Sequence, residues 1–186
     1  MGKKPLVIAV NAVVGGGKTT IANALSEKLG NARTIRFDDY HDVNKNIADI
    51  HKWIADGADY DLWTMDSIIA DINELLEEAE KSGNIDYIIL DYPFGYKQKQ
   101  IAGFINLSIF IDTPFDIALA RLIIRDISPQ TKTDDIIKKL NGYLSTRSDY
   151  HYSQAANKDA DLKIDGSLSV DIITDIIVHK IQEFKF

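Results

Sequence analysis

The chain has 186 residues, of which 45% are hydrophobic and 26% are charged, as in an ordinary soluble globular protein. The net charge of −7 argues against nucleic acid as a partner, and the absence of cysteine excludes disulfides and Cys-based zinc sites. There is no apolar run long enough to span a membrane and no signal peptide before the first predicted strand. We therefore expect a cytoplasmic protein, without a membrane partner, that forms a single domain over residues 1–186.

The first predicted strand, 6–10, is followed by a glycine-rich loop and then by an apolar pattern of helical period that ends at Gly30. Strand, glycine loop, Lys-Thr and helix are together the context of a phosphate-binding P-loop. Backbone N–H groups and the positive helix end attract phosphate, while Lys18 reaches the β- and γ-phosphates and the Thr19 hydroxyl ligates Mg²⁺. The predicted nucleotide-binding residues of this loop are Val14, Gly15, Gly16, Gly17, Lys18, Thr19 and Thr20.

One position departs from the usual pattern G-x-x-x-x-G-K-[ST], because Ala12 stands where the first glycine is expected. Alanine fits there if the backbone does not need a positive φ. The alternative interpretation is a glycine-rich turn that binds nothing.

Strands and helices alternate along the rest of the chain. We predict strands at 33–37, 85–90, 107–111 and 161–164, and helices at 44–54, 66–82, 133–150 and 168–184. A further helix is expected to begin with Thr113 as N-cap and Pro114 at its first position, and to end near Asp126. This alternation is typical of an α/β protein with right-handed crossovers. The expected fold is a three-layer P-loop NTPase fold, a five-stranded parallel sheet of order 2-3-1-4-5 flanked by helices.

Four stretches occur in an order that resembles the P-loop small-molecule kinases of the uridine kinase and phosphoribulokinase-like group. They are Gly15–Thr20, Asp38-Asp39-Tyr40, Arg121–Asp126 and Tyr143–Arg147, and the resemblance covers nearly the whole chain. It implies an ATP-dependent kinase that uses ATP and Mg²⁺ to phosphorylate a hydroxyl of a nucleoside, uridine-like, or of a related small metabolite. The acceptor is the expected partner; the oligomeric state stays open, with a homo-oligomer among the options.

The resemblance also assigns roles to individual residues. Asp38, the first acid after the second strand, matches the general base that takes the proton of the acceptor hydroxyl. Lys18 and Arg125 match residues that stabilise the transferring phosphoryl group, and Arg121 lies on the same helix face as Arg125 and is assigned to nucleotide binding. Asp91, at the end of the strongest strand, matches an acid that acts on the metal through water. A polar turn without function is the alternative for Asp38.

A second set of residues is expected on the acceptor side: Asp39 and Tyr40 beside the base, Asp61 as a holder of sugar hydroxyls, Tyr92, and Arg147 facing the site. A solvated loop acid is the alternative for Asp61, and a surface ion pair is the alternative for Arg147.

Aromatic and imidazole side chains give weaker signals. Two tryptophans and a tyrosine at irregular spacing, Trp53, Trp63 and Tyr60, are interpreted as core residues rather than base-stacking ones. The four histidines show no metal-ligand spacing.

The lid-like segment, 126–147, is poor in arginine: the loop 128–133 offers only Lys132, and Leu122 stands where a second arginine is frequent. This composition, with Ala12, leaves a catalytically degenerate kinase homologue as an alternative function. A regulatory or GTPase-type nucleotide-binding protein is another. It would be favoured by a guanine-reading Asn-Lys-x-Asp after a late strand, and the chain has none, because residues 157–159 precede the last predicted strand and lack the spacing.

Overall fold

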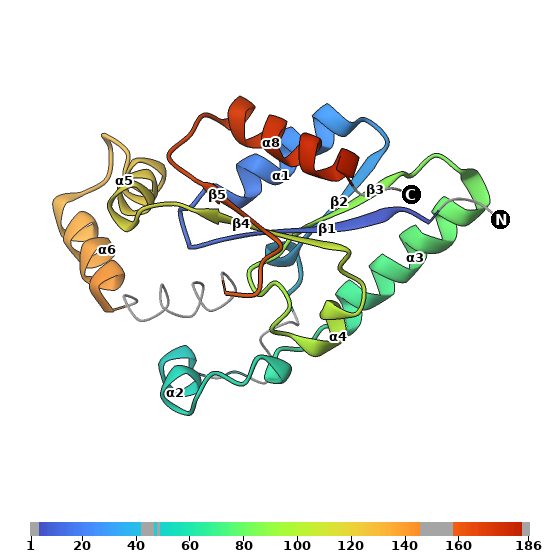
Figure 1. The fold of residues 1–186 in the computed structure, drawn as a ribbon. Helices are drawn as coiled ribbons and strands as arrows, with labels where there is room; N and C mark the ends of the chain where they lie inside the picture. The colour runs from blue at the N-terminus through green and yellow to red at the C-terminus, as the bar shows by residue number, and fades with distance from the viewer. Residues whose placement is uncertain (1–3, 42–46, 48, 146–157, 184–186) are drawn as a thin grey trace.

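The computed structural model describes residues 4–41, 47, 49–145 and 158–183, and these fold around a five-stranded parallel sheet of order β2-β3-β1-β4-β5 (Figure 1). The strands are β1 (Leu6–Ala12), β2 (Ala32–Arg36), β3 (Tyr87–Asp91), β4 (Leu107–Asp112) and β5 (Leu162–Asp165). All of their pairings are parallel. The predicted fold class and the predicted strand order are both confirmed.

Helices cover both faces of the sheet and give it three layers, with α1 and α8 on one face and α3 and α4 on the other (Figure 1). The helices are α1 (Lys18–Leu29), α2 (Ile50–Ala55), α3 (Asp66–Ser82), α4 (Lys99–Ala102), α5 (Phe115–Asp126), α6 (Thr133–Ser145) and α8 (Val170–Glu183). Two short 3₁₀ turns, η1 (Phe37–Asp39) and η2 (Tyr60–Leu62), complete the described elements. None of the helices in the described ranges is long and apolar enough to cross a bilayer.

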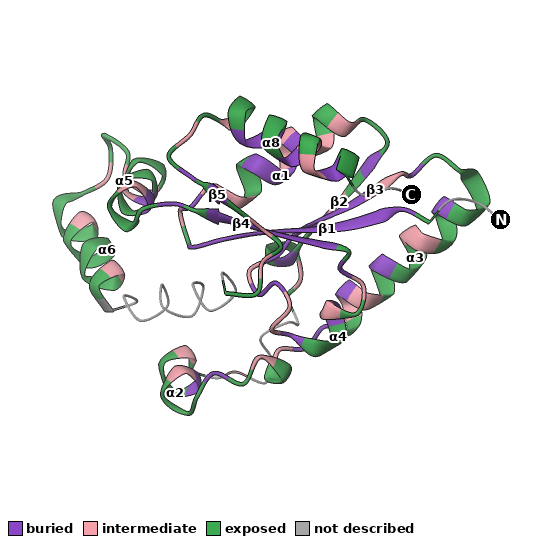
Figure 2. Ribbon diagram, viewed as in Figure 1, coloured by how far each residue is buried: buried purple, intermediate pink, exposed green. Residues whose placement is uncertain are grey.

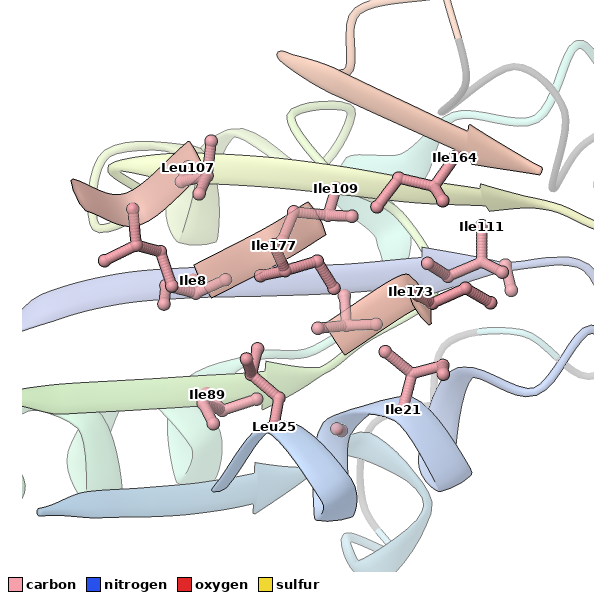
Figure 3. Close-up of a cluster of buried hydrophobic side chains, with 14 of the residues drawn as sticks. Ile8, Ile21, Leu25, Ile89, Leu107, Ile109, Ile111, Ile164, Ile173 and Ile177 are labelled. Atoms are coloured by element: carbon pink, nitrogen blue, oxygen red, sulfur yellow. The ribbon is translucent and has the colours of Figure 1, made fainter. Parts of the chain in front are cut away.

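The central strand β1 is buried along its whole length and divides the core in two (Figure 2). Its side chains alternate between the two faces. Ile8 belongs to a cluster with α1 and α8, in which Ile21, Leu25, Ile173 and Ile177 meet isoleucines of the strands (Figure 3). Val7 and Ala9 belong to the cluster on the opposite face, against α3. The carboxyl ends of the strands are thereby fixed at one edge of the sheet, where open α/β folds place ligands.

Several predicted boundaries were wrong or lie outside the described residues. Helix α5 begins at Phe115 without a side-chain cap, because the Thr113 hydroxyl donates instead to the carbonyl oxygen of Gly16 at 2.8 Å. Helix α4 was not predicted. The helix predicted at 44–54 is described as α2 from Ile50, since 42–46 and 48 lie outside the described residues. The last part of the helix predicted to residue 150, from 146, also lies outside them.

Candidate active site

The P-loop joins β1 to α1, and its backbone shows why Ala12 is tolerated. Ala12 is the last residue of β1 and pairs with Ile111 of β4, so it has an extended conformation that any residue adopts. Positive φ angles occur instead at Gly15, 76°, and Gly17, 95°. The loop needs glycine at those two positions, and the first position of the motif does not require one.

The P-loop is packed tightly against α5, the helix that carries both candidate arginines. A Cβ added to Gly15 would lie 2.4 Å from the carbonyl oxygen of Ala118 and 2.7 Å from Cγ of Leu122. The bond from Thr113 to Gly16 holds the loop to the start of the same helix. Loop and helix therefore cannot shift independently.

A cavity of about 730 Å³ opens beside the P-loop at the carboxyl edge of the sheet. Its lining includes nine of the predicted site residues, namely Val14, Gly15, Gly17, Lys18, Thr19, Thr20, Asp38, Arg121 and Arg125. Gly16 is the one predicted residue of the P-loop that does not line the cavity, because it is buried. Segments that lie far apart in the sequence thus bring the predicted base, the predicted phosphate ligands and two arginines to one space.

Lys18, which lines this cavity, is bound to Asp91. The two side chains form an ion pair, and only 3% of the Asp91 side chain is exposed. Asp91 ends β3 beside Val10 of β1, directly before the P-loop. A buried carboxylate close to the start of α1, where Thr19 stands, is a donor set that suits Mg²⁺, which binds one or two protein oxygens and takes its other ligands from phosphate and water. In the described ranges no three acidic or histidine side chains gather into a metal site of their own.

Asp38 of η1 and Arg125 of α5 both line the cavity. Arg125 donates from Nε to Oδ1 of Asp126 at 2.6 Å, and the pKa of its guanidinium is raised mainly by this bond. The charges of Tyr143 and of Asp38 make smaller contributions in the same direction. Asp38 is exposed on the cavity wall. A hydroxyl placed between these side chains would have a proton acceptor on one side and a cation on the other.

Arg121 also lines the cavity and lies next to the P-loop. It donates from Nη2 to the carbonyl oxygen of Gly166 at 3.2 Å, in the turn after β5. A Cβ added to Gly17 would lie 3.7 Å from its Nη1. Arg121 therefore stands where a nucleotide on the P-loop would meet a positive charge.

The wall opposite the P-loop is aromatic. Five rings from four segments line it and contact one another, with centroid distances of 5.0 Å to 5.7 Å: Phe37, Trp53, Tyr60, Trp63 and Phe94. Most of these pairs are edge-to-face or tilted, as favoured by aromatic quadrupoles. The interpretation of the two tryptophans and Tyr60 as core residues is incomplete, because they pack together and also line the cavity.

Four of the residues predicted for the acceptor side, Asp39, Tyr40, Asp61 and Tyr92, do not line the cavity. Asp61 accepts from the backbone N–H of Lys99 at 3.0 Å and from its Nζ at 2.5 Å, and these bonds lower the pKa of its carboxyl. Tyr40 donates to Asp71 of α3 at 2.5 Å. Asp39 is exposed beside it. Their roles in acceptor binding stay predictions.

Tyr92 and Arg147 complete the predicted acceptor set. Tyr92 is buried against Phe37 and Phe94, and burial raises its pKa. Its hydroxyl has no hydrogen-bond partner among the described residues. Arg147 lies outside the described residues.

Two residues of the site were missed. Asn11 is fully buried in β1; its Oδ1 accepts from the N–H of Gly95 at 2.8 Å, and its Nδ2 donates to Ile109 and Ser108 of β4. It therefore fastens the loop that carries Phe94 to the strand that carries the P-loop. A polar residue inside an otherwise apolar strand was the available signal. The second is Asp126, for which the sequence predicts only that a helix ends there.

Comparison with known proteins supports the kinase resemblance. No protein-family model matches the chain. A uridine kinase of Geobacillus sp. (strain WCH70) is 25% identical and one of Geobacillus kaustophilus (strain HTA426) is 26% identical, and each alignment covers 98% of this chain and 96% of the relative. The chain is thus a distant homologue of uridine kinases over nearly its full length, as the motifs indicate.

Solved structures show the same fold. TT1252 from Thermus thermophilus superimposes with a TM-score of 0.58 at 14% identity, over 99% of this chain and 100% of the other. An uncharacterized protein from Eubacterium ventriosum ATCC 27560 superimposes with a TM-score of 0.53 at 18% identity, over 97% and 99%. These likenesses establish the fold alone.

Proposed function

We propose that this protein is an ATP-dependent kinase that transfers the terminal phosphoryl group of ATP, bound with Mg²⁺, to a hydroxyl of a nucleoside, uridine-like, or of a related small metabolite. One observation carries the proposal: the P-loop, Asp38 and Arg125 line a single cavity. A protein that only binds a nucleotide needs the P-loop, whereas a carboxylate and an arginine aimed at the same space suit group transfer.

The chain's own residues divide the reaction between them. P-loop N–H groups and Lys18 bind the phosphates once Lys18 leaves Asp91. Asp38 accepts the proton of the acceptor hydroxyl as that oxygen attacks the terminal phosphorus and the bond to the leaving diphosphate breaks. Arg125 neutralises charge on the transferring group, and Arg121 binds the nucleotide beside Gly17. The aromatic wall excludes water from this space.

Thr19 and Asp91 are the residues that would hold Mg²⁺. The metal ion, when bound, would offset the negative charge of the phosphates. Asp91 is nearly fully buried, so its carboxylate needs a cation beside it, and the ion pair with Lys18 meets that need when no ligand is present.

The acceptor is expected to present a flat or apolar body. Five aromatic side chains line its side of the cavity, and Asp38 is the one carboxylate among the described lining residues. A nucleobase satisfies this description, and its riboside carries the hydroxyl that Asp38 needs. The apolar wall favours a nucleoside over a sugar phosphate as the acceptor, because the phosphate that a sugar phosphate already carries would lie against apolar side chains.

The deciding experiment compares Asp38→Asn with Asp86→Asn on a panel of nucleosides and related ribosides. Asp86 gives a matched control, because the same change is made before β3, at the opposite edge of the sheet, where Asp86 accepts from Asn31 at 3.0 Å. Asp38→Asn should lower kcat by about 10²- to 10⁴-fold, the usual contribution of a general base, while ATP affinity by calorimetry stays near that of the wild type. Unchanged turnover in Asp38→Asn would contradict the proposal.

The same panel separates the kinase from a degenerate homologue. A degenerate protein binds ATP, so the nucleotide raises its melting temperature. It forms no phosphorylated product with any acceptor. That result, obtained with Mg²⁺ present, would refute the kinase and retain the nucleotide site.

A further inference from the structure

Four hydrogen bonds meet at one residue, Asp126, between α5 and α6. Arg125 donates to its carboxylate from Nε at 2.6 Å and from Nη2 at 3.4 Å. The Tyr143 hydroxyl donates to Oδ2 at 2.8 Å, and Lys139 donates from Nζ to the backbone carbonyl oxygen at 2.6 Å. Tyr143 and Lys139 are both on α6, so the lid helix binds the acid that binds the candidate catalytic arginine.

Arg125 depends on this contact for its orientation. Its side chain is 66% exposed, and a long exposed side chain has many rotamers when nothing fixes it. A guanidinium has five N–H donors in a rigid plane. Two of its nitrogens face Asp126, and the remaining donors, which bind no other residue in the described ranges, can serve the cavity that Arg125 lines.

The carboxylate has to satisfy two partners at once. Only 26% of the Asp126 side chain is exposed, and the bonds from Arg125 and then Tyr143 lower the pKa of its carboxyl, so it stays ionised. A movement of α6 that withdrew Tyr143 would leave Oδ2 of Asp126 with only the long bond of 3.4 Å from Nη2 of Arg125 and allow the acid to rotate. The guanidinium would rotate with it.

We propose that Asp126 is a positioning residue that couples the location of α6 to the orientation of Arg125, with Tyr143 as the contact from the lid. This inference rests on the proposed function in one respect, the assignment of Arg125 to the transferring phosphoryl group. The coupling between α6 and Asp126 does not depend on it. The two can therefore be tested separately.

The first experiment measures amide hydrogen exchange over α6 in the ligand-free protein. Asp126→Asn and Tyr143→Phe should each speed exchange at 133–145 by about tenfold, the effect of losing a hydrogen bond to a charged group. Arg125→Ala should leave exchange there unchanged, because Tyr143 and Lys139 keep their acceptors. Glu77→Gln is the matched control, since it removes the acid of an exposed ion pair with Lys81 on α3. Unchanged exchange in Asp126→Asn would overturn the coupling.

The second experiment is a double-mutant cycle on turnover. Asp126→Asn and Tyr143→Phe should each lower kcat by about tenfold and leave the KM of the acceptor unchanged, because the arginine acts on the transferring group. In an Arg125→Ala background neither change should cost anything further. Equal losses in both backgrounds would show that Asp126 acts independently of Arg125 and would overturn the proposal.

The outcomes keep the two proposals apart. If the wild type phosphorylates no acceptor, the proposed function fails and hydrogen exchange alone decides the coupling. If turnover is normal and the cycle is additive, the kinase stands and the positioning role of Asp126 is refuted.

Discussion

Replacement of Gly15 by alanine tests whether the P-loop is held by its packing on α5. Gly15 has a φ of 76°, and its Cβ would lie 2.4 Å from a backbone carbonyl oxygen of that helix. The left-handed backbone costs a non-glycine residue about 1 kcal/mol, and overpacking adds about 1–3 kcal/mol. We expect a loss of about 3 kcal/mol in the free energy of unfolding, or roughly 6–12 °C in Tm for a chain of this size.

Two control variants separate these costs. Gly83→Ala has a left-handed backbone with a φ of 66° and nothing within 4 Å of the new Cβ, so it bears the backbone cost alone, about 1 kcal/mol. Gly103→Ala has a φ of −66° and open space, so it bears neither cost. Urea unfolding gives the stability of each variant, and calorimetry gives its affinity for ATP.

The nucleotide affinity of Gly15→Ala should fall by about tenfold, equal to about 1.4 kcal/mol, because the loop must move away from α5 to admit the methyl group. The two controls should bind as the wild type does. If Gly15→Ala is no less stable than Gly83→Ala, the packing argument is refuted.

Two further predictions concern buried polar groups. Tyr92→Phe should be neutral or stabilising by up to about 1 kcal/mol, with the acceptor KM unchanged, since its buried hydroxyl finds no partner in the part of the chain that the structure describes. A raised KM in steady-state assays would instead support the predicted acceptor role. Asn11→Ala should lower the free energy of unfolding by about 2–4 kcal/mol, because the N–H of Gly95 loses its hydrogen-bond acceptor. It should also raise the acceptor KM, because the loop that carries Phe94 loses this support. A KM equal to that of the wild type would contradict this.

The part of the molecule that could be predicted is the part set by local pattern. The P-loop, the sheet order and α3 over Asp66–Ser82 follow from glycine spacing, strand alternation and a helical apolar stripe. Asp38 and Arg125 could be placed because each follows a recognisable element and the carboxyl edge of the sheet gathers such positions.

What could not be predicted depends on partners distant in the sequence. Thr113 has the local signature of an N-cap, but its hydroxyl donates to the carbonyl oxygen of Gly16 instead of capping the helix. Asp61 binds Lys99, 38 residues away, and its own sequence neighbourhood gives no sign of that contact. Helix α4 has only four residues, too few for a periodic signal.

The ion pair between Lys18 and Asp91 determines which phosphate ligands bind favourably at the P-loop. A phosphate that took Lys18 alone would strand a buried carboxylate, whose isolation costs several kcal/mol. A ligand that brings its own divalent cation replaces both partners in one exchange and leaves no charge uncompensated. On the proposed function, nucleotide and magnesium should therefore bind with positive linkage, each raising the affinity for the other.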